Sequence, residues 1–123
     1  MFVSPSGDDS NPGTAASPLK SLAAAQAKVQ MLLKVGGGIT VNLRAGTYYE
    51  SLVLGPADSG SQGAPVTWQA YPGEEAVLSG GQKLQCEWKP VTMNNETVYS
   101  CSLQAGQTSF PSLFINGRQM QRA

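Results

Sequence analysis

Hydrophobic residues recur at three- and four-residue steps in one segment of the chain, which is typical of one face of an amphipathic helix. These positions are Leu19, Leu22, Ala25, Val29, Leu32 and Leu33. Ser21 is a suitable N-cap, and three consecutive glycines at 36–38 end the pattern. We therefore predict one helix over residues 21–35. The residues at 5–18, rich in Ser, Pro, Gly and Asp, predict a polar loop before it.

After the glycines the hydrophobic period changes to two, which is typical of strands. Short segments of this kind are separated by Gly, Pro and Ser residues, and we predict a strand in each. The segments are 39–44, 51–54, 66–70, 76–78, 98–99 and 113–115, with one more short strand at 2–4. The chain is therefore predicted to be mainly β with a single helix.

An internal repeat relates residues 41–55 to residues 66–80 without gaps, at an offset of 25 positions. Val41 matches Val66 and Leu43 matches Trp68, so the alternation of inward and outward positions is kept. Two short strands cannot bury an apolar face alone, whereas stacked equivalent coils can. We therefore predict stacked coils over 39–81; the alternative is a pair of hairpins in a sandwich.

Strand character is interrupted after the second coil and resumes near residue 113. We therefore predict that residues 82–111 form a hairpin insertion and that the next coil starts at residue 112. The whole chain, 1–123, is then one cap followed by about two to three coils.

Composition and charge exclude several classes of function. Eight Lys and Arg offset eight Asp and Glu, so no long-range attraction draws phosphates, and we expect no nucleic-acid partner. No apolar run approaches the ~20 residues that cross a bilayer, so no membrane segment is expected. The chain has no His, which excludes His-based metal sites and Ser-His triads within it.

Two cysteines, Cys86 and Cys101, lie on either side of the predicted hairpin. A turn at 93–94 would place them directly opposite each other, near disulfide distance. A turn at 94–95, where two Asn residues tolerate positive φ, would instead place Cys101 opposite Trp88. We predict the disulfide, with two buried thiols as the alternative.

Asn95 begins an Asn-Glu-Thr sequence at the predicted hairpin tip, which is an acceptor pattern for N-glycosylation. A disulfide and a glycosylation site together favour a secreted protein. Residues 1–5 have no charged and apolar signal segment. We therefore expect that a signal peptide was removed or that the chain is a piece of a longer protein.

Four stretches of the chain resemble the N-terminal part of right-handed parallel β-helix proteins of the pectin-lyase-like superfamily. They read VSPSGDDSNPGT (3–14), SPLKSLAAA (17–25), VNLRAGTYY (41–49) and PVTWQAYPGE (65–74). The closing SLFINGRQMQR (112–122) is similar to the segment that follows in carbohydrate-active members, including glycoside hydrolases and polysaccharide lyases. The resemblance implies that the helix caps the N-terminal mouth of an incomplete solenoid, and that the active groove lies on later coils.

The function implied is that of a capping fragment of a secreted protein that acts on polysaccharide. The parent would be a hydrolase or lyase, and this chain would hold no complete active site. A non-catalytic glycan-binding or structural β-helix module is the alternative. The expected partners are polysaccharide and the remaining coils of the parent.

Two acids and one aromatic residue are the candidates for action on a sugar. Glu50 and Glu75 match in the repeat, so stacking would bring them about 5 Å apart, the separation of a retaining glycosidase. Their ordinary role is a solvated pair of turn residues. Tyr49 is expected to point outward and to stack on a sugar ring, whereas Trp68 is expected in the core.

A short cluster of oxygen-bearing side chains, Asp8, Asp9 and Asn11, has the ligand type that Ca²⁺ prefers. It lacks a bidentate acid further along the chain, and Asx-type turns explain it equally well. No cofactor is therefore expected, with Ca²⁺ as the one alternative.

Overall fold

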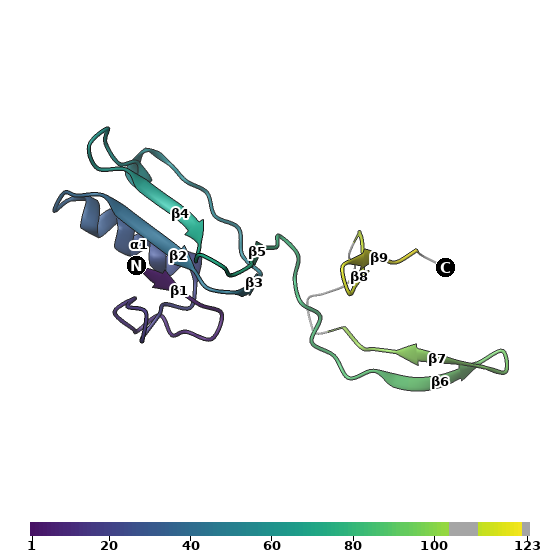
Figure 1. Ribbon diagram of the computed structural model, residues 1–123. Helices are drawn as coiled ribbons and strands as arrows, with labels where there is room; N and C mark the ends of the chain where they lie inside the picture. Colours follow the sequence, from purple (N-terminus) through teal and green to yellow (C-terminus); the bar gives the residue numbers. More distant parts are fainter. Residues whose placement is uncertain (104–110, 122–123) are drawn as a thin grey trace. The chain divides into compact units, whose positions relative to one another are not determined.

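The computed structural model describes residues 1–103 and 111–121 (Figure 1). The chain divides into two compact units, Met1–Gln82 and Lys83–Ala123. Each unit has its own strand ladders and is described by itself.

Two parallel sheets make up the first unit. One sheet has the order β1 (Phe2–Val3), β2 (Ile39–Leu43), β4 (Val66–Ala70), and the other pairs β3 (Gly46–Tyr48) with β5 (Ala76–Leu78). All of these pairs are parallel. Each sheet therefore takes one strand from residues 39–48 and one from residues 66–78, as the stacking of successive segments requires.

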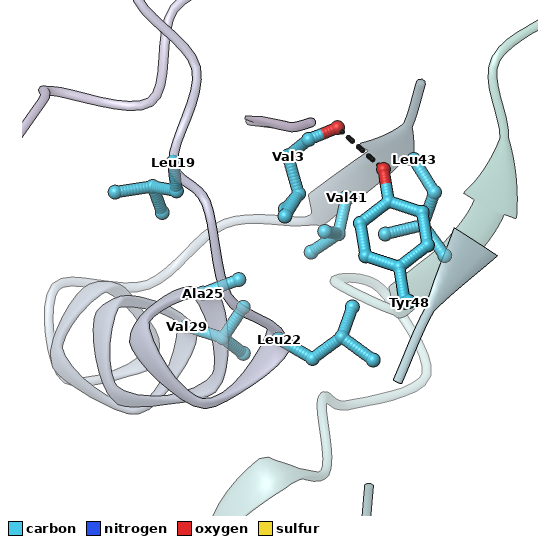
Figure 2. Packing of buried hydrophobic residues seen from close by; sticks show 8 residues of the cluster. All are labelled: Val3, Leu19, Leu22, Ala25, Val29, Val41, Leu43 and Tyr48. Carbon is cyan, nitrogen blue, oxygen red and sulfur yellow. Dashed lines mark hydrogen bonds between the residues drawn. The ribbon is translucent and has the colours of Figure 1, made fainter. Parts of the chain in front are cut away.

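The core lies between the first sheet and α1 (Leu22–Leu33), as Figure 2 shows. Side chains that alternate along β2 face the helix, so Val41 and Leu43 are buried, whereas Thr40 is exposed. Trp68 lies opposite Val41 and packs against this core, as expected. The buried hydrophobic residues are Val3, Leu19, Leu22, Ala25, Val29, Val41, Leu43 and Tyr48.

The helix forms where its periodicity predicts it. The Ser21 hydroxyl accepts a hydrogen bond from the Ala24 amide at 3.1 Å, which caps the first turn. Beyond the C-cap, Gly36 and Gly37 have φ of +90° and +105°, a conformation that glycine adopts without strain. Within the described part of the chain, no helix has the length and apolar content to span a membrane.

The register of the sheets corrects the gapless repeat. Val41 pairs with Trp68, an offset of 27, and Gly46 pairs with Ala76, an offset of 30. The first shift differs from 25 by two residues, so the inward and outward positions are preserved. The second offset is three residues larger than the first, because five residues separate β4 from β5 whereas two separate β2 from β3.

The predicted strand at 51–54 was wrong. The strand that pairs with β5 is β3, and residues 51–54 form no regular structure before the short 3₁₀ helix η1 (Pro56–Asp58). Val53 and Leu54 are exposed in that connection. Leu52 of the same segment packs against the core from outside any strand.

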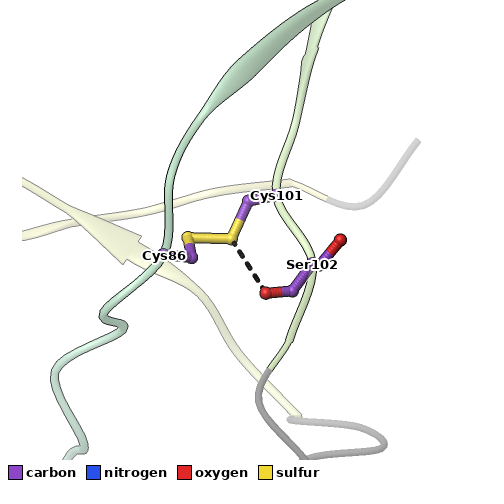
Figure 3. The surroundings of a disulfide bond; sticks show 3 residues. All are labelled: Cys86, Cys101 and Ser102. Carbon is purple, nitrogen blue, oxygen red and sulfur yellow. Dashed lines mark hydrogen bonds between the residues drawn. A yellow bond between two sulfur atoms is a disulfide. The ribbon is translucent and has the colours of Figure 1, made fainter.

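The second unit contains two antiparallel hairpins. In the first, β6 (Lys89–Met93) pairs with β7 (Glu96–Ser100) across a turn at 94–95, where both Asn residues have positive φ. The disulfide between Cys86 and Cys101 is present, with 5.8 Å between the Cα atoms (Figure 3). The ladder ends at the Lys89 rung, so the irregular residues before β6 bring Cys86 to Cys101 despite the 94–95 turn.

The second hairpin joins β8 (Phe114–Ile115) to β9 (Arg118–Gln119). Asn116 and Gly117 form its turn with φ of +50° and +77°. The expectation that a further coil begins at residue 112 stays a prediction. Residues 104–110 of the expected insertion lie outside the described residues.

Replacement of one helix residue tests the packing of α1 on the sheet. Leu22 is fully buried, so Leu22→Ala should lower the free energy of unfolding by about 2–5 kcal/mol, because it removes apolar contacts and leaves a cavity. Met31, on the same helix, is 64% exposed, and Met31→Ala should change it by less than about 0.5 kcal/mol. Urea unfolding followed by circular dichroism measures both; equal effects would contradict the packing.

Candidate functional site

The structure does not bring Glu50 and Glu75 together. The Gly46 amide donates to the Glu75 carbonyl at 3.0 Å, so Glu75 lies at the start of the β3–β5 ladder. Glu50 follows Tyr48, which closes the other end of the same ladder. The expected stack of two carboxylates depended on the 25-residue offset and is therefore corrected.

Glu50 holds the start of α1. Its Oε2 accepts a hydrogen bond from the Leu22 amide at 3.0 Å. Asp9 adds a second carboxylate: its Oδ1 accepts from the amides of Lys20 and Ser21, both at 2.8 Å. Amides of the first helical turn have no partner within the helix, and the positive end of the helix dipole favours anions. Both acids are thereby explained by the architecture.

The other two residues proposed for Ca²⁺ also have local roles. The Asp8 carboxylate accepts from the Ser10 amide and hydroxyl, and the hydrogen bonds from Ser10 hold the Asp8 pKa below its usual value. The Asn11 side-chain amide donates to the Pro18 carbonyl at 2.9 Å. Within the described ranges, no three acidic or Cys side chains gather as a metal-binding group.

An ion pair in the first unit joins Arg44 to Glu74. The Arg44 Nη2 atom lies 2.7 Å from Glu74 Oε1, and Arg44 Nε donates to both carboxylate oxygens. The Ala45 amide also donates to Glu74, at 2.6 Å. These donors, Arg44 first, lower the pKa of Glu74. The guanidinium lies 5.2 Å from the centre of the Tyr71 ring.

A shallow depression of about 480 Å³ borders this pair, and Ser6, Arg44 and Glu74 line it among others. Glu74 neutralises Arg44, so the depression presents polar groups and no net charge. It has none of the separated acids that glycoside hydrolysis requires. The geometry here can bind polar groups, and it holds no assembled acid–base pair.

The aromatic candidates separate into buried and exposed residues. Tyr48 is buried, and its hydroxyl lies within hydrogen-bond distance of two carbonyls, that of Arg44 at 2.8 Å and that of Val3 at 3.0 Å. Figure 2 shows the contact with Val3. Burial raises the pKa of this phenol to about 12. Tyr49 is 50% exposed. Of these two neighbours, only Tyr49 therefore has a ring that a sugar can reach.

Asp58 was not found by the sequence reasoning. It is buried, and its carboxylate accepts hydrogen bonds from the Gly55 amide and from the side chains of Gln26 and Gln30 at 2.7–2.9 Å. The Gly55 bond contributes most to its lowered pKa. The sequence signal for this site was a pair of Gln residues at positions i and i+4 of the predicted helix, together with an Asp two positions after a Pro.

No protein-family model matches the chain. The uncharacterized protein YwoF of Bacillus subtilis is 28% identical over 127 residues, which cover 95% of this chain and 25% of YwoF. The pectate lyase PEL9 of Emericella nidulans is 34% identical over 80 residues, which cover 65% of this chain and 18% of the lyase.

A solved structure of a glycoside hydrolase matches the whole chain, with a TM-score of 0.82 and 30% identity, over 21% of its own length. The likenesses to a lyase and to a hydrolase confirm the resemblance to carbohydrate-active proteins of the pectin-lyase-like superfamily. This chain spans a quarter or less of the length of each of these relatives.

Removing the Glu74 carboxylate should reduce stability in a pH-dependent way. An acid with a lowered pKa stabilises the fold above its unfolded pKa, near 4.5, and this contribution is lost as the pH falls through the folded pKa. Glu74→Gln should therefore be less stable than wild type at neutral pH, and the difference should narrow in acid. Urea unfolding at a series of pH values measures this.

The neighbouring exposed residue provides the control, because Glu75→Gln should change the free energy of unfolding at neutral pH by less than about 0.5 kcal/mol. A Glu74→Gln protein that keeps the wild-type difference between neutral and acidic pH would contradict the role given to the Arg44–Glu74 pair.

Proposed function

We propose that this chain is the helix-capped N-terminal portion of a secreted, right-handed parallel β-helix protein that acts on polysaccharide. The observation that carries the proposal is the parallel pairing of successive segments in two separate sheets. Helix α1 covers the inward side chains of the first sheet, as a cap on a solenoid interior would.

The outer strands of the first unit support continuation into a further coil. β4 and β5 are the last strands of their sheets, and Val77 and Leu78 on β5 are 43% and 48% exposed. The indole Nε1 of Trp68 on β4 is buried without a hydrogen-bond partner in the described part of the chain. A stacked coil would pair the strand edges, cover these apolar side chains and offer acceptors for the indole.

Catalysis is assigned to coils of the longer protein, as hydrolase or lyase, and not to residues 1–123. Glu50 binds the start of α1 and lies at the opposite end of the β3–β5 ladder from Glu75. An acid engaged in this way is poorly suited to act on a sugar bond, because catalysis needs two carboxyl groups at a fixed separation across the substrate.

The second unit supports an oxidising compartment. The Cys86–Cys101 disulfide persists where thiols are not kept reduced. Asn95 is exposed in the hairpin turn, where a glycan would meet no packing obstacle. We therefore propose export, with glycosylation at Asn95 when the host provides the modification.

Activity assays on two proteins test the proposal. One is this chain, and the other is the polypeptide encoded when the reading frame is followed beyond Ala123. Release of reducing ends and of unsaturated uronides is measured on polygalacturonate and on neutral hemicelluloses. The longer protein should cleave at least one polysaccharide, and residues 1–123 should cleave none.

The matched control is Glu50→Gln in the longer protein, which should keep the wild-type rate because the carboxylate acts at the start of α1. Cleavage by residues 1–123 alone, or a longer protein without activity on any of these polysaccharides, would refute the proposal.

A further inference from the structure

The β6–β7 hairpin has two chemically different faces, which its register defines. Directly opposite residues of an antiparallel pair project to the same face, and successive pairs alternate. One face, here called the Tyr99 face, consists of Pro90, Thr92, Thr97 and Tyr99. The opposite face carries the pairs Val91–Val98, Met93–Glu96 and Lys89–Ser100.

The hydrogen-bonding pattern of the ladder indicates that opposed side chains on the Tyr99 face lie close together. The pair next to a two-residue turn exchanges backbone hydrogen bonds, and pairs then alternate along the ladder. Pro90–Tyr99 is therefore a non-hydrogen-bonded pair, where opposed side chains lie closest and the missing amide of proline costs nothing. A proline ring and a phenol ring thus adjoin, next to two threonine hydroxyls.

The exposure of this face suits a ligand with both apolar and hydroxyl groups. Tyr99 is 68% exposed, so its ring is open to a ligand from solvent. Aromatic rings stack on the C–H faces of pyranoses, and hydroxyls of Thr or Tyr donate to and accept from sugar hydroxyls. A glycan chain lying along the strands would meet both kinds of group.

The charge of a glycan determines how well it matches this face. No acidic or basic side chain belongs to it. The nearest strand charges, Lys89 and Glu96, lie on the opposite face, and Lys89 is 3.4 Å from Glu87. An acidic glycan would find no cation on the Tyr99 face to balance its carboxylates, so the electrostatic match is to an uncharged glycan.

The disulfide stabilises the hairpin that carries the Tyr99 face. A two-stranded hairpin is marginally stable in water by itself. The Cys86–Cys101 bond closes this one at its base, outside the last rung of the ladder (Figure 3). Covalent closure reduces the entropy that a ligand would otherwise have to overcome in ordering the strands.

From these observations we infer that the Tyr99 face is a binding platform for a neutral polysaccharide chain of pyranoses. The inference rests on the proposed function, because it names the substrate class and a place where the substrate is held. It assigns no catalytic role to these residues. Packing of the same face against another part of the longer protein is the competing outcome of the test.

Titration of the disulfide-bonded chain with xylohexaose, cellohexaose and a galacturonic acid hexamer tests the inference, with amide shifts recorded by two-dimensional NMR. A neutral oligosaccharide should shift amides of residues 89–100, and the acidic hexamer should not. Tyr99→Ala should weaken binding about tenfold or more, as loss of an aromatic anchor does. Tyr99→Phe should bind like wild type, because the ring remains.

Met93→Ala is the matched control, because Met93 is 60% exposed on the opposite face of the same hairpin, and its affinity should stay within about twofold of wild type. The dispersed spectrum of each variant verifies that the hairpin is folded. Absence of binding to both neutral oligosaccharides, unchanged affinity of Tyr99→Ala, or preference for the acidic hexamer would each overturn the inference. Cleavage by the longer protein does not depend on these outcomes, so the two proposals fail separately.

Discussion

The pleat of the parallel sheet is the constraint on which the first unit depends. Because side chains alternate across a strand, the pairing of β1 with β2 puts Val3 beside Leu43 on the inward side. A shift of one residue would turn Thr40 and Asn42 toward α1 and expose Val41. The helix packs only against an apolar surface, so the register of the sheet determines where α1 lies and which polar groups its ends meet.

Several carboxylates of the first unit stabilise this arrangement. Asp9 and Glu50 bind amides at the start of the helix, and Asp58 binds two glutamines on its outer side. Glu74 ties Arg44 to the turn after β4. These carboxylates therefore serve the architecture of the first unit. Chemistry at the sugar bond requires acids that are free of such contacts and correctly spaced.

Periodicity predicted the helix, β2 and β4, because each of these elements is long enough to show its pattern. It also predicted the inward position of Trp68 on β4. It failed at β3, since only Tyr48 of its three residues is buried, whereas Leu52 and Leu54 imitated a strand. A gapless alignment could not reveal that the connection between β4 and β5 is three residues longer than the connection between β2 and β3. The expected stacking of Glu50 on Glu75 was wrong for the same reason, because the 30-residue offset of the β3–β5 ladder separates the two residues. The disulfide was predicted correctly, although the turn that forms is the one expected to prevent it.

Scalar couplings across backbone hydrogen bonds, measured by NMR on isotope-labelled protein, test the parallel stacking most directly. The account predicts one coupling between the Tyr71 amide nitrogen and the Leu43 carbonyl carbon, and a second between Ser79 and Tyr48; both hydrogen bonds are 2.8 Å long. Two further couplings, from the Ile39 amide to the Pro65 carbonyl and from the Gly46 amide to the Glu75 carbonyl, give each pair of strands a second contact. The four couplings together fix the direction and the register of both sheets. A coupling from the Leu43 carbonyl to the amide of Gln69, or a pattern of antiparallel pairs between β2 and β4, would contradict it.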